Sequence, residues 1–351
     1  MRRGLISRSP AELPDAALDA RLARVRAAMG EAGLDALLIY TNNTRPAGVS
    51  WLTGFVPYWS EALLVVPRER APVLVVALTY RVKSWIERTS RVAEVIHTPR
   101  IGLEAARLIA AGKADAAVGI ADRDGLAAGI FDDLRAGGSC LAFNDASDLF
   151  AALRAEADSA EVALATKAAS IAQRALGEAS ARDASLGDII AAVEGAARRL
   201  GAEEIYVAAA PDLGRDRRLI RIEGGMALGD SFALRATVAY KGTWVRLVRT
   251  FRRDDAAVSD DAAARLAAAV AELPSARGFA SLSSWLVEGC RIAQPLEPLM
   301  GSRVSEPRPP LPRALVSVQM SLEIDGRPLL VGAPALVGGR GEASALLVTP
   351  F

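Results

Sequence analysis

Residues 229–251 read GDSFALRATVAYKGTWVRLVRTF, and this stretch decides the fold. Apolar and polar side chains alternate along residues 232–240 and again along residues 244–251. A period of two residues is typical of a β-strand with one buried face. Gly229-Asp230 supplies a turn before the first run, and Lys241-Gly242-Thr243 supplies the bend between the runs. The stretch therefore predicts a β-hairpin.

The bulk properties indicate a globular protein with two domains. The chain has 351 residues, of which 51% are hydrophobic and 24% are charged. Its 42 basic and 41 acidic residues leave a net charge of +1, so no global field favours nucleic acid or a membrane surface. Two cysteines, Cys140 and Cys290, are too few for a disulfide framework.

The sequence also bounds the compartment and the metal chemistry. The first ten residues lack the apolar segment of a signal peptide, and no run of about 18 apolar residues occurs. We therefore expect a cytoplasmic protein without a membrane span. The chain has one histidine, His97, so a multi-histidine metal site is excluded, and a structural role is the favoured interpretation of this residue.

The first part of the chain alternates strands with helices. Residues 16–32 show helical spacing, and Gly33 ends that helix. A buried strand follows at residues 35–40, and later strands alternate with helices as far as residue 136. Such alternation predicts a sheet flanked by helices. We interpret residues 143–151 as a linker.

The second part predicts a helical start and a strand-rich end. Long helices are expected at residues 153–181 and 189–200, followed by a strand at 205–210 and the hairpin. A helix at 259–273 and a shorter one at 281–289 come next. The last strands are expected at 314–324, 327–337 and 343–348.

The hairpin resembles the metal-binding hairpin of the creatinase/aminopeptidase P/prolidase family, which has the pita-bread fold. The residues that carry the resemblance are Gly229-Asp230, Tyr240, Gly242 and Arg249-Thr250-Phe251. Residues 51–55, WLTGF, resemble a "YLTGF" motif in the N-terminal domain of the same family. The resemblance implies an α/β fold, with a creatinase-like N-terminal domain at residues 1–148 and a trimmed pita-bread (duplicated α+β) domain at residues 149–351.

The resemblance also implies where a metal site would lie and that its ligands are gone. Family members hold two metal ions with two Asp, one His and two Glu. Here Arg235 and Arg246 stand at the Asp positions, eleven residues apart, Cys290 stands at the His position and Gln319 at the first Glu position. No carboxylate stands near Gly332, where the second Glu would lie. We therefore predict no metal and no other cofactor.

The replacements suggest a different ligand. Guanidinium groups bind carboxylate or phosphate through paired hydrogen bonds, so Arg235, Arg246 and Arg291 predict a site for a small anion. Gln319 and Tyr240 are further ligand-binding candidates. The alternative is that the arginines pair with acids such as Glu297, Glu323 or Asp325, or turn to solvent.

Two residues are candidates for catalysis. Cys290 is a possible nucleophile, activated by a nearby Arg291, although a buried inert cysteine is the commoner case. Glu297 lies where the family has a functional histidine and is a possible general base, although a salt-bridged glutamate is the commoner case.

Three classes of function stay open. The first is a metal-independent enzyme that hydrolyses or eliminates at a C–N bond of a small carboxylate-containing molecule. The second is a non-catalytic pseudoenzyme that binds a ligand or a protein partner. The third is an Xaa-Pro metallopeptidase. The resemblance further implies a homodimer, or a hetero-oligomer with a catalytic paralogue.

Overall fold

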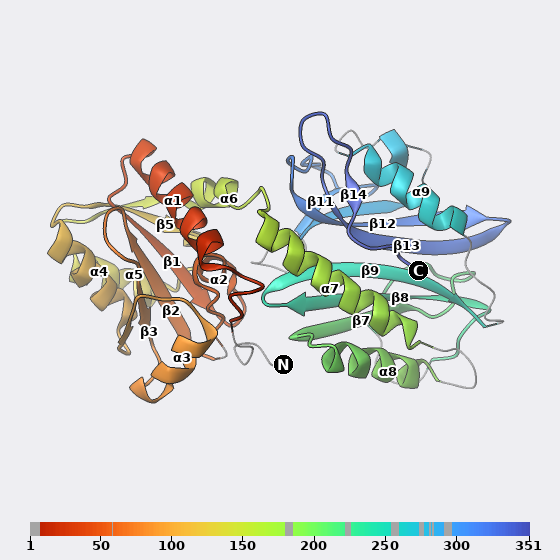
Figure 1. Cartoon of the computed structure of the whole chain (residues 1–351), viewed down its shortest axis with the longest axis horizontal. Helices are drawn as coiled ribbons and strands as arrows, with labels where there is room; N and C mark the ends of the chain where they lie inside the picture. The colour runs from red at the N-terminus through yellow and green to blue at the C-terminus, as the bar shows by residue number, and fades with distance from the viewer. Residues whose placement is uncertain are drawn as a thin grey trace. The chain divides into compact units, whose positions relative to one another are not determined.

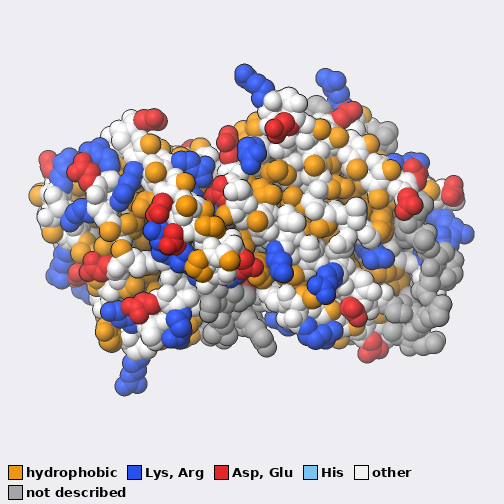
Figure 2. Space-filling model, in the orientation of Figure 1, with side chains coloured by type: hydrophobic (Ala, Val, Ile, Leu, Met, Phe, Trp, Pro, Cys, Tyr) orange, Lys and Arg blue, Asp and Glu red, His pale blue; other side chains and the backbone are white. Residues whose placement is uncertain are grey.

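The computed structural model describes residues 8–57, 59–179, 185–221, 226–253, 260–273, 277–280, 282, 284–290 and 297–351. These residues form two compact units, which are divided in the sequence between Ala155 and Glu156. Each unit contains one β-sheet with helices packed on it (Figure 1). No helix in these ranges is long and apolar enough to cross a membrane. Basic and acidic side chains are interspersed over the face seen in Figure 2, in keeping with the near-zero net charge.

The N-terminal unit is a six-stranded sheet. Its strands are β1 (Ala36–Asn42), β2 (Glu61–Pro67), β3 (Val73–Val76), β4 (Glu94–His97), β5 (Ala117–Ala121) and β6 (Ala142–Asp145). The strand order is β4-β3-β2-β1-β5-β6. The sheet is mixed, because β1 pairs antiparallel with β2 and parallel with β5.

Helices cover both faces of this sheet. They are α1 (Asp15–Glu31), α2 (Ala47–Thr53), α3 (Lys83–Thr89), α4 (Ile101–Gly112), α5 (Ala128–Gly137) and α6 (Ser147–Leu153). Leu37 and Ile39 of β1 pack with α1, α2, α3 and α6, and Leu38 and Tyr40 pack on the other face with α4 and α5. A strand covered on both faces has a continuous apolar sequence, which is what residues 36–40 show.

In the described ranges, the C-terminal unit has an eight-stranded sheet and three α-helices. Its strands are β7 (Glu204–Ala210), β8 (Ser231–Tyr240), β9 (Thr243–Arg252), β10 (Trp285–Gly289), β11 (Glu297–Gly301), β12 (Leu315–Ile324), β13 (Arg327–Leu336) and β14 (Ala345–Leu346). The strand order is β11-β10-β12-β13-β9-β8-β7, and β14 pairs with β13. The helices are α7 (Ser159–Gly177), α8 (Leu186–Arg199) and α9 (Asp260–Ala271).

β8 and β9 form the predicted hairpin, with a register that runs from Ser231↔Arg252 to Tyr240↔Thr243. The loop has two residues, Lys241 and Gly242, with φ of 46° and 78°. Two positive φ angles give a loop whose twist matches that of the strands, and glycine adopts such an angle at little cost. Thr243, which the sequence places in the bend, belongs to β9.

The two faces of the C-terminal sheet differ in chemistry. On one face, Leu234 and Leu247 pack with α7 and α8, and Val318 and Val331 pack with α9. Because side chains alternate along a strand, the neighbouring residues point to the opposite face. That opposite face carries polar side chains, and we call it the polar face: Arg235, Thr237, Arg246, Glu288, Ser317 and Gln319.

Three further sequence-based predictions differ from the structure. Residues 143–151, interpreted as a linker, form the end of β6 and most of α6. The short helix expected at 281–289 is wrong, because residues 285–289 form β10, which pairs with β11 and β12. The helix expected from residue 153 begins at Ser159, because Asp158 caps it by accepting a hydrogen bond from the backbone N of Glu161.

Gly332 lies where the two halves of the C-terminal sheet meet. It pairs with Val248 of β9 on one side and with Gln319 of β12 on the other. A Cβ atom at Gly332 would lie 2.6 Å from the carbonyl oxygen of Val318 and 3.1 Å from the Cα of Gln319. Both contacts are with backbone, which cannot move without disturbing the sheet.

We therefore expect Gly332→Ala to lower the free energy of unfolding by about 1–3 kcal/mol, the usual cost of overpacking. Gly177→Ala is the control in the same unit, because a Cβ there meets nothing within 4 Å. Urea denaturation of the full chain measures both variants. Equal stability of the two would contradict the close packing at Gly332.

Candidate functional site

The arginines of the hairpin lie together on the polar face. Arg235 of β8 is opposite Val248, and Arg246 of β9 is opposite Thr237. They therefore occupy diagonal positions on neighbouring strands, where Cα atoms are about 7–8 Å apart. Two long cationic side chains at this spacing influence each other, and the charge of Arg246 helps to lower the pKa of Arg235.

Arg246 has an acidic partner that the sequence did not single out. Its Nη1 donates a hydrogen bond to Oε1 of Glu288, a buried residue of β10. The backbone N of Arg246 also donates to Oγ of Ser317 at 2.9 Å. A strand prediction for residues 285–289 would have placed Glu288 on this strand, two residues before Cys290, which directly follows it.

Arg235 has no such partner. Among the residues that the structure describes, none accepts a hydrogen bond from its buried Nε, and none forms an ion pair with it. Burial, and after it the charge of Arg246, lower the pKa of Arg235 to about 10, while Glu288 opposes the shift. A pKa of about 10 still leaves Arg235 charged at neutral pH, so the cluster of two arginines and one glutamate has one surplus positive charge.

Cys290 lies beside this cluster as a buried thiol. Its Sγ is 3.3 Å from Oγ of Ser317. Burial, with a smaller contribution from the charge of Glu288, raises the pKa of Cys290 to about 12, and the hydrogen bond between Cys290 and Ser317 opposes the shift. The thiol is therefore protonated at neutral pH, which does not suit a nucleophile.

The other predicted site residues have separate environments. Gln319 is on the polar face, in the same register row as Arg235, and its Oε1 is buried without a hydrogen-bond partner in the described part of the chain. Tyr240 points to the helix-covered face and packs against that core. Glu297 is on β11 and forms an ion pair with Arg308 at 2.6 Å. Arg291 lies outside the described residues.

His97 lies in the N-terminal unit, at the end of β4. Its Nδ1 is 2.9 Å from the carbonyl oxygen of Leu78, and its ring meets that of Tyr80 edge-on with centroids 5.5 Å apart. These contacts give the histidine a packing role between β4 and the residues after β3.

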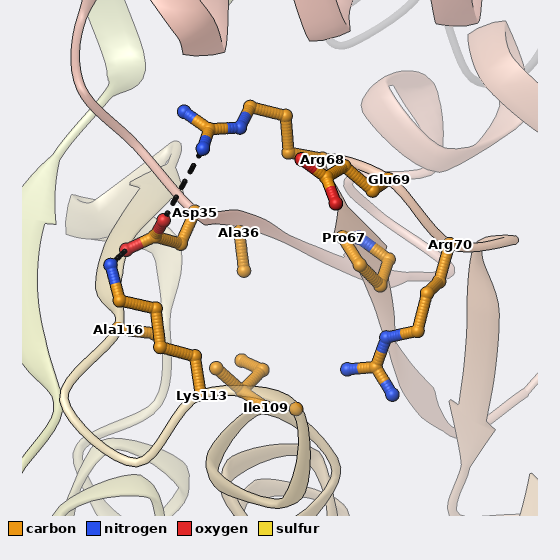
Figure 3. Close-up of a pocket in the computed structure, with 10 residues that line it drawn as sticks. Asp35, Ala36, Pro67, Arg68, Glu69, Arg70, Ile109, Lys113 and Ala116 are labelled. Atoms are coloured by element: carbon orange, nitrogen blue, oxygen red, sulfur yellow. Dashed lines mark hydrogen bonds and ion pairs between the residues drawn. The ribbon is translucent and has the colours of Figure 1, made fainter.

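A charged cavity of about 390 Å³ lies in the N-terminal unit, at the start of β1. Figure 3 shows Lys113 and Arg68 directed toward Asp35, at 2.7 Å and 3.7 Å. The hydrogen bond from Lys113 is the main reason that the pKa of Asp35 is lowered. These ion pairs tie β1 to the loop after α4, so the charges of this cavity serve the fold.

Comparison with known proteins identifies the N-terminal unit. Residues 21–155 match the Creatinase/Prolidase N-terminal domain. The N-terminal unit is a creatinase/prolidase N-terminal domain. No curated protein sequence matches the chain.

Solved structures extend the likeness over nearly the whole chain. The prolidase from Pyrococcus horikoshii OT3 matches with a TM-score of 0.70 and 14% identity, covering 93% of this chain and 97% of that one. The X-Pro aminopeptidase from Thermotoga maritima MSB8 matches with a TM-score of 0.70 and 15% identity, covering 93% and 97%. The dipeptidase PepE from Mycobacterium ulcerans matches with a TM-score of 0.65 and 19% identity, covering 95% of each chain. The chain therefore has the prolidase fold, and the predicted fold class is confirmed.

The polar face does not fit the pair of metal ions that the prolidase resemblance implies. No group of three or more His, Cys, Asp or Glu residues able to hold a metal ion occurs in the described ranges. The one carboxylate of the cluster, Glu288, is paired with Arg246, and the surplus charge of Arg235 repels a cation.

The two cysteines should differ sharply in reactivity. Raising the pKa of Cys290 from 9.0 to about 12 lowers its thiolate fraction at pH 8 roughly a thousandfold, whereas Cys140 is exposed. We expect Ellman's reagent to label one thiol rapidly in the folded chain and a second after denaturation. Cys140→Ser should abolish the rapid reaction. A rapid thiol in that variant would show that Cys290 is accessible and activated.

Proposed function

We propose that the polar face binds a small carboxylate-containing molecule without a metal ion. The observation that carries the proposal is Arg235, a half-buried cation with no acidic partner among the described residues. A charged group taken out of water is stabilised by an opposite charge, and a guanidinium binds a carboxylate through two parallel hydrogen bonds. A bound carboxylate would balance the surplus charge of the cluster.

The neighbouring groups support this role. The ion pair with Glu288 holds Arg246 in place and compensates its charge, so Arg235 is left to bind the ligand. Gln319 offers a neutral acceptor in the same register row, suited to an N–H group of the ligand.

The same contacts favour binding over turnover. Hydrolysis or elimination at a C–N bond needs a base or a nucleophile at the reacting atoms. Glu288 is paired with Arg246, Glu297 is paired with Arg308, and the thiol of Cys290 is protonated at neutral pH. A non-catalytic binding protein is therefore our preferred function, and a metal-free hydrolase or lyase is the second. Dimerisation and a cytoplasmic location stay predictions.

The comparisons favour a third function, because the named relatives are a prolidase, an X-Pro aminopeptidase and a dipeptidase. Those names belong to proteins that are 14–19% identical to this chain, at which level the likeness carries the fold alone. Xaa-Pro cleavage is therefore the alternative to be tested directly.

Arg235→Gln should weaken binding of the tightest ligand in a panel of small carboxylates about ten- to a hundredfold, the usual effect of losing a charge-assisted hydrogen bond. Titration calorimetry measures the affinity. Arg265→Gln is the control, because Arg265 is exposed on α9 and pairs with Asp261 one turn away. Arg246→Ala is the less specific variant, since it leaves Glu288 buried and unpaired. Absence of binding by every carboxylate, or equal affinity for wild type and Arg235→Gln, would contradict the proposal.

Metal should neither bind nor activate the protein. After dialysis against Mn²⁺, Co²⁺ or Zn²⁺ and removal of free metal, elemental analysis should find far less than one ion per chain. Xaa-Pro dipeptides should stay uncleaved in the presence of each metal. A stoichiometric ion together with metal-dependent cleavage would restore the peptidase function.

A further inference from the structure

An aromatic pair lies on the polar face beside the arginines. The rings of Tyr206 of β7 and Trp244 of β9 stack with centroids 5.8 Å apart and planes 4° apart. The register places Tyr206 opposite Thr237, and Trp244 opposite Ala239. Tyr206 and Trp244 are paired with residues whose side chains lie on the same face as those of Arg235 and Arg246. The rings and the guanidinium groups therefore share one face of the sheet.

The separation between the rings and the cations is short. Ala208 of β7 is opposite Arg235, which puts Tyr206 at a diagonal position about 7–8 Å from Arg235. Trp244 precedes Arg246 by two residues on the same strand. The residues between them on this face, Ala208 and Thr237, have small side chains. A ligand of the size of one ring could contact both Tyr206 and Arg235.

The setting of the pair distinguishes it from ordinary core packing. Trp244 is buried, but the side chain of Tyr206 is 38% exposed although it is large and stacked. The hydroxyl of Tyr206 donates a hydrogen bond to Oε2 of Glu204 at 2.5 Å, which fixes the orientation of the ring. The result is a rigid, accessible aromatic surface next to a partly desolvated cation that has no partner among the described residues.

We infer that the ligand of the polar face is an aromatic carboxylate, whose carboxylate binds Arg235 and whose ring stacks on Tyr206. The inference rests on the proposed function and adds the chemical class of the ligand. Stacking of a planar ring on a fixed aromatic side chain adds binding energy beyond the area it buries. A saturated ring of the same size on a ligand of the same charge gains only the binding energy that comes from burying its apolar surface.

The test uses three probes of equal charge: benzoate, cyclohexanecarboxylate and acetate. Titration calorimetry on the full chain should show benzoate binding about fivefold tighter than cyclohexanecarboxylate, the effect expected of an aromatic contact. Tyr206→Leu should remove this preference and leave the affinity for acetate unchanged. Tyr80→Leu is the matched control, because Tyr80 is 69% exposed in the N-terminal unit, and it should keep the preference.

The outcomes separate the two proposals. Equal affinity of the wild type for benzoate and cyclohexanecarboxylate would overturn the aromatic class without use of any variant. A benzoate preference that persists in folded Tyr206→Leu would overturn the role of Tyr206. In both cases, weaker acetate binding by Arg235→Gln would leave the carboxylate site standing. Failure of all three probes to bind would instead overturn the proposed function itself.

Discussion

The ion pair between Arg246 and Glu288 is the constraint on which the polar face depends. Two charges taken out of water are tolerated when they compensate each other. The pair joins β9 to β10, which β12 and β13 separate in the strand order. Ser317 of β12 accepts a hydrogen bond from the backbone of Arg246 and contacts the thiol of Cys290, so one network ties the hairpin to the last strands. Because that network leaves Arg235 out, the arrangement creates a fixed scaffold beside a cation that has no ion-pair partner in the described part of the chain.

The fold tolerates this chemistry because fold and site use opposite faces of one sheet. The core under α7, α8 and α9 is built from residues such as Leu234, Leu247 and Val318, which alternate with the polar-face residues along the same strands. Residues of one parity build the core under the helices, and residues of the other parity, apart from a small apolar cluster that includes Ala233, Val248 and Leu330, set what the face binds. A change from acid to arginine on the polar face therefore reverses the charge preference of the site without changing the side chains that specify the sheet.

The parity of the strands also explains what the sequence could and could not reveal. Alternation over residues 232–240 and 244–251 predicts the hairpin and puts Arg235 and Arg246, eleven apart, on one face once the two-residue loop is known. Tyr240 is five residues from Arg235, and this odd separation places it on the other face of the strand. The strand prediction alone therefore excludes Tyr240 from the cluster. The place of Glu288 in the cluster could not be predicted from the sequence. Its strand is only five residues long and is defined by pairing with β12, about thirty residues away, and such pairing leaves little local signal.

The cavity of the N-terminal unit shows by contrast why Arg235 carries a functional proposal. There Lys113 and Arg68 each form an ion pair with Asp35, so both of these cations have an acidic partner within the fold. A cluster whose cations are already paired gains little from a ligand, because an incoming anion must break existing pairs before it forms new ones. Arg235 has already lost much of its hydration on folding and has no described partner to displace. A carboxylate that reaches Arg235 therefore replaces its lost hydration without breaking an ion pair. This difference between Arg235 and the paired cations beside Asp35, more than the number of charged residues, marks the polar face as the place where a ligand is stabilised.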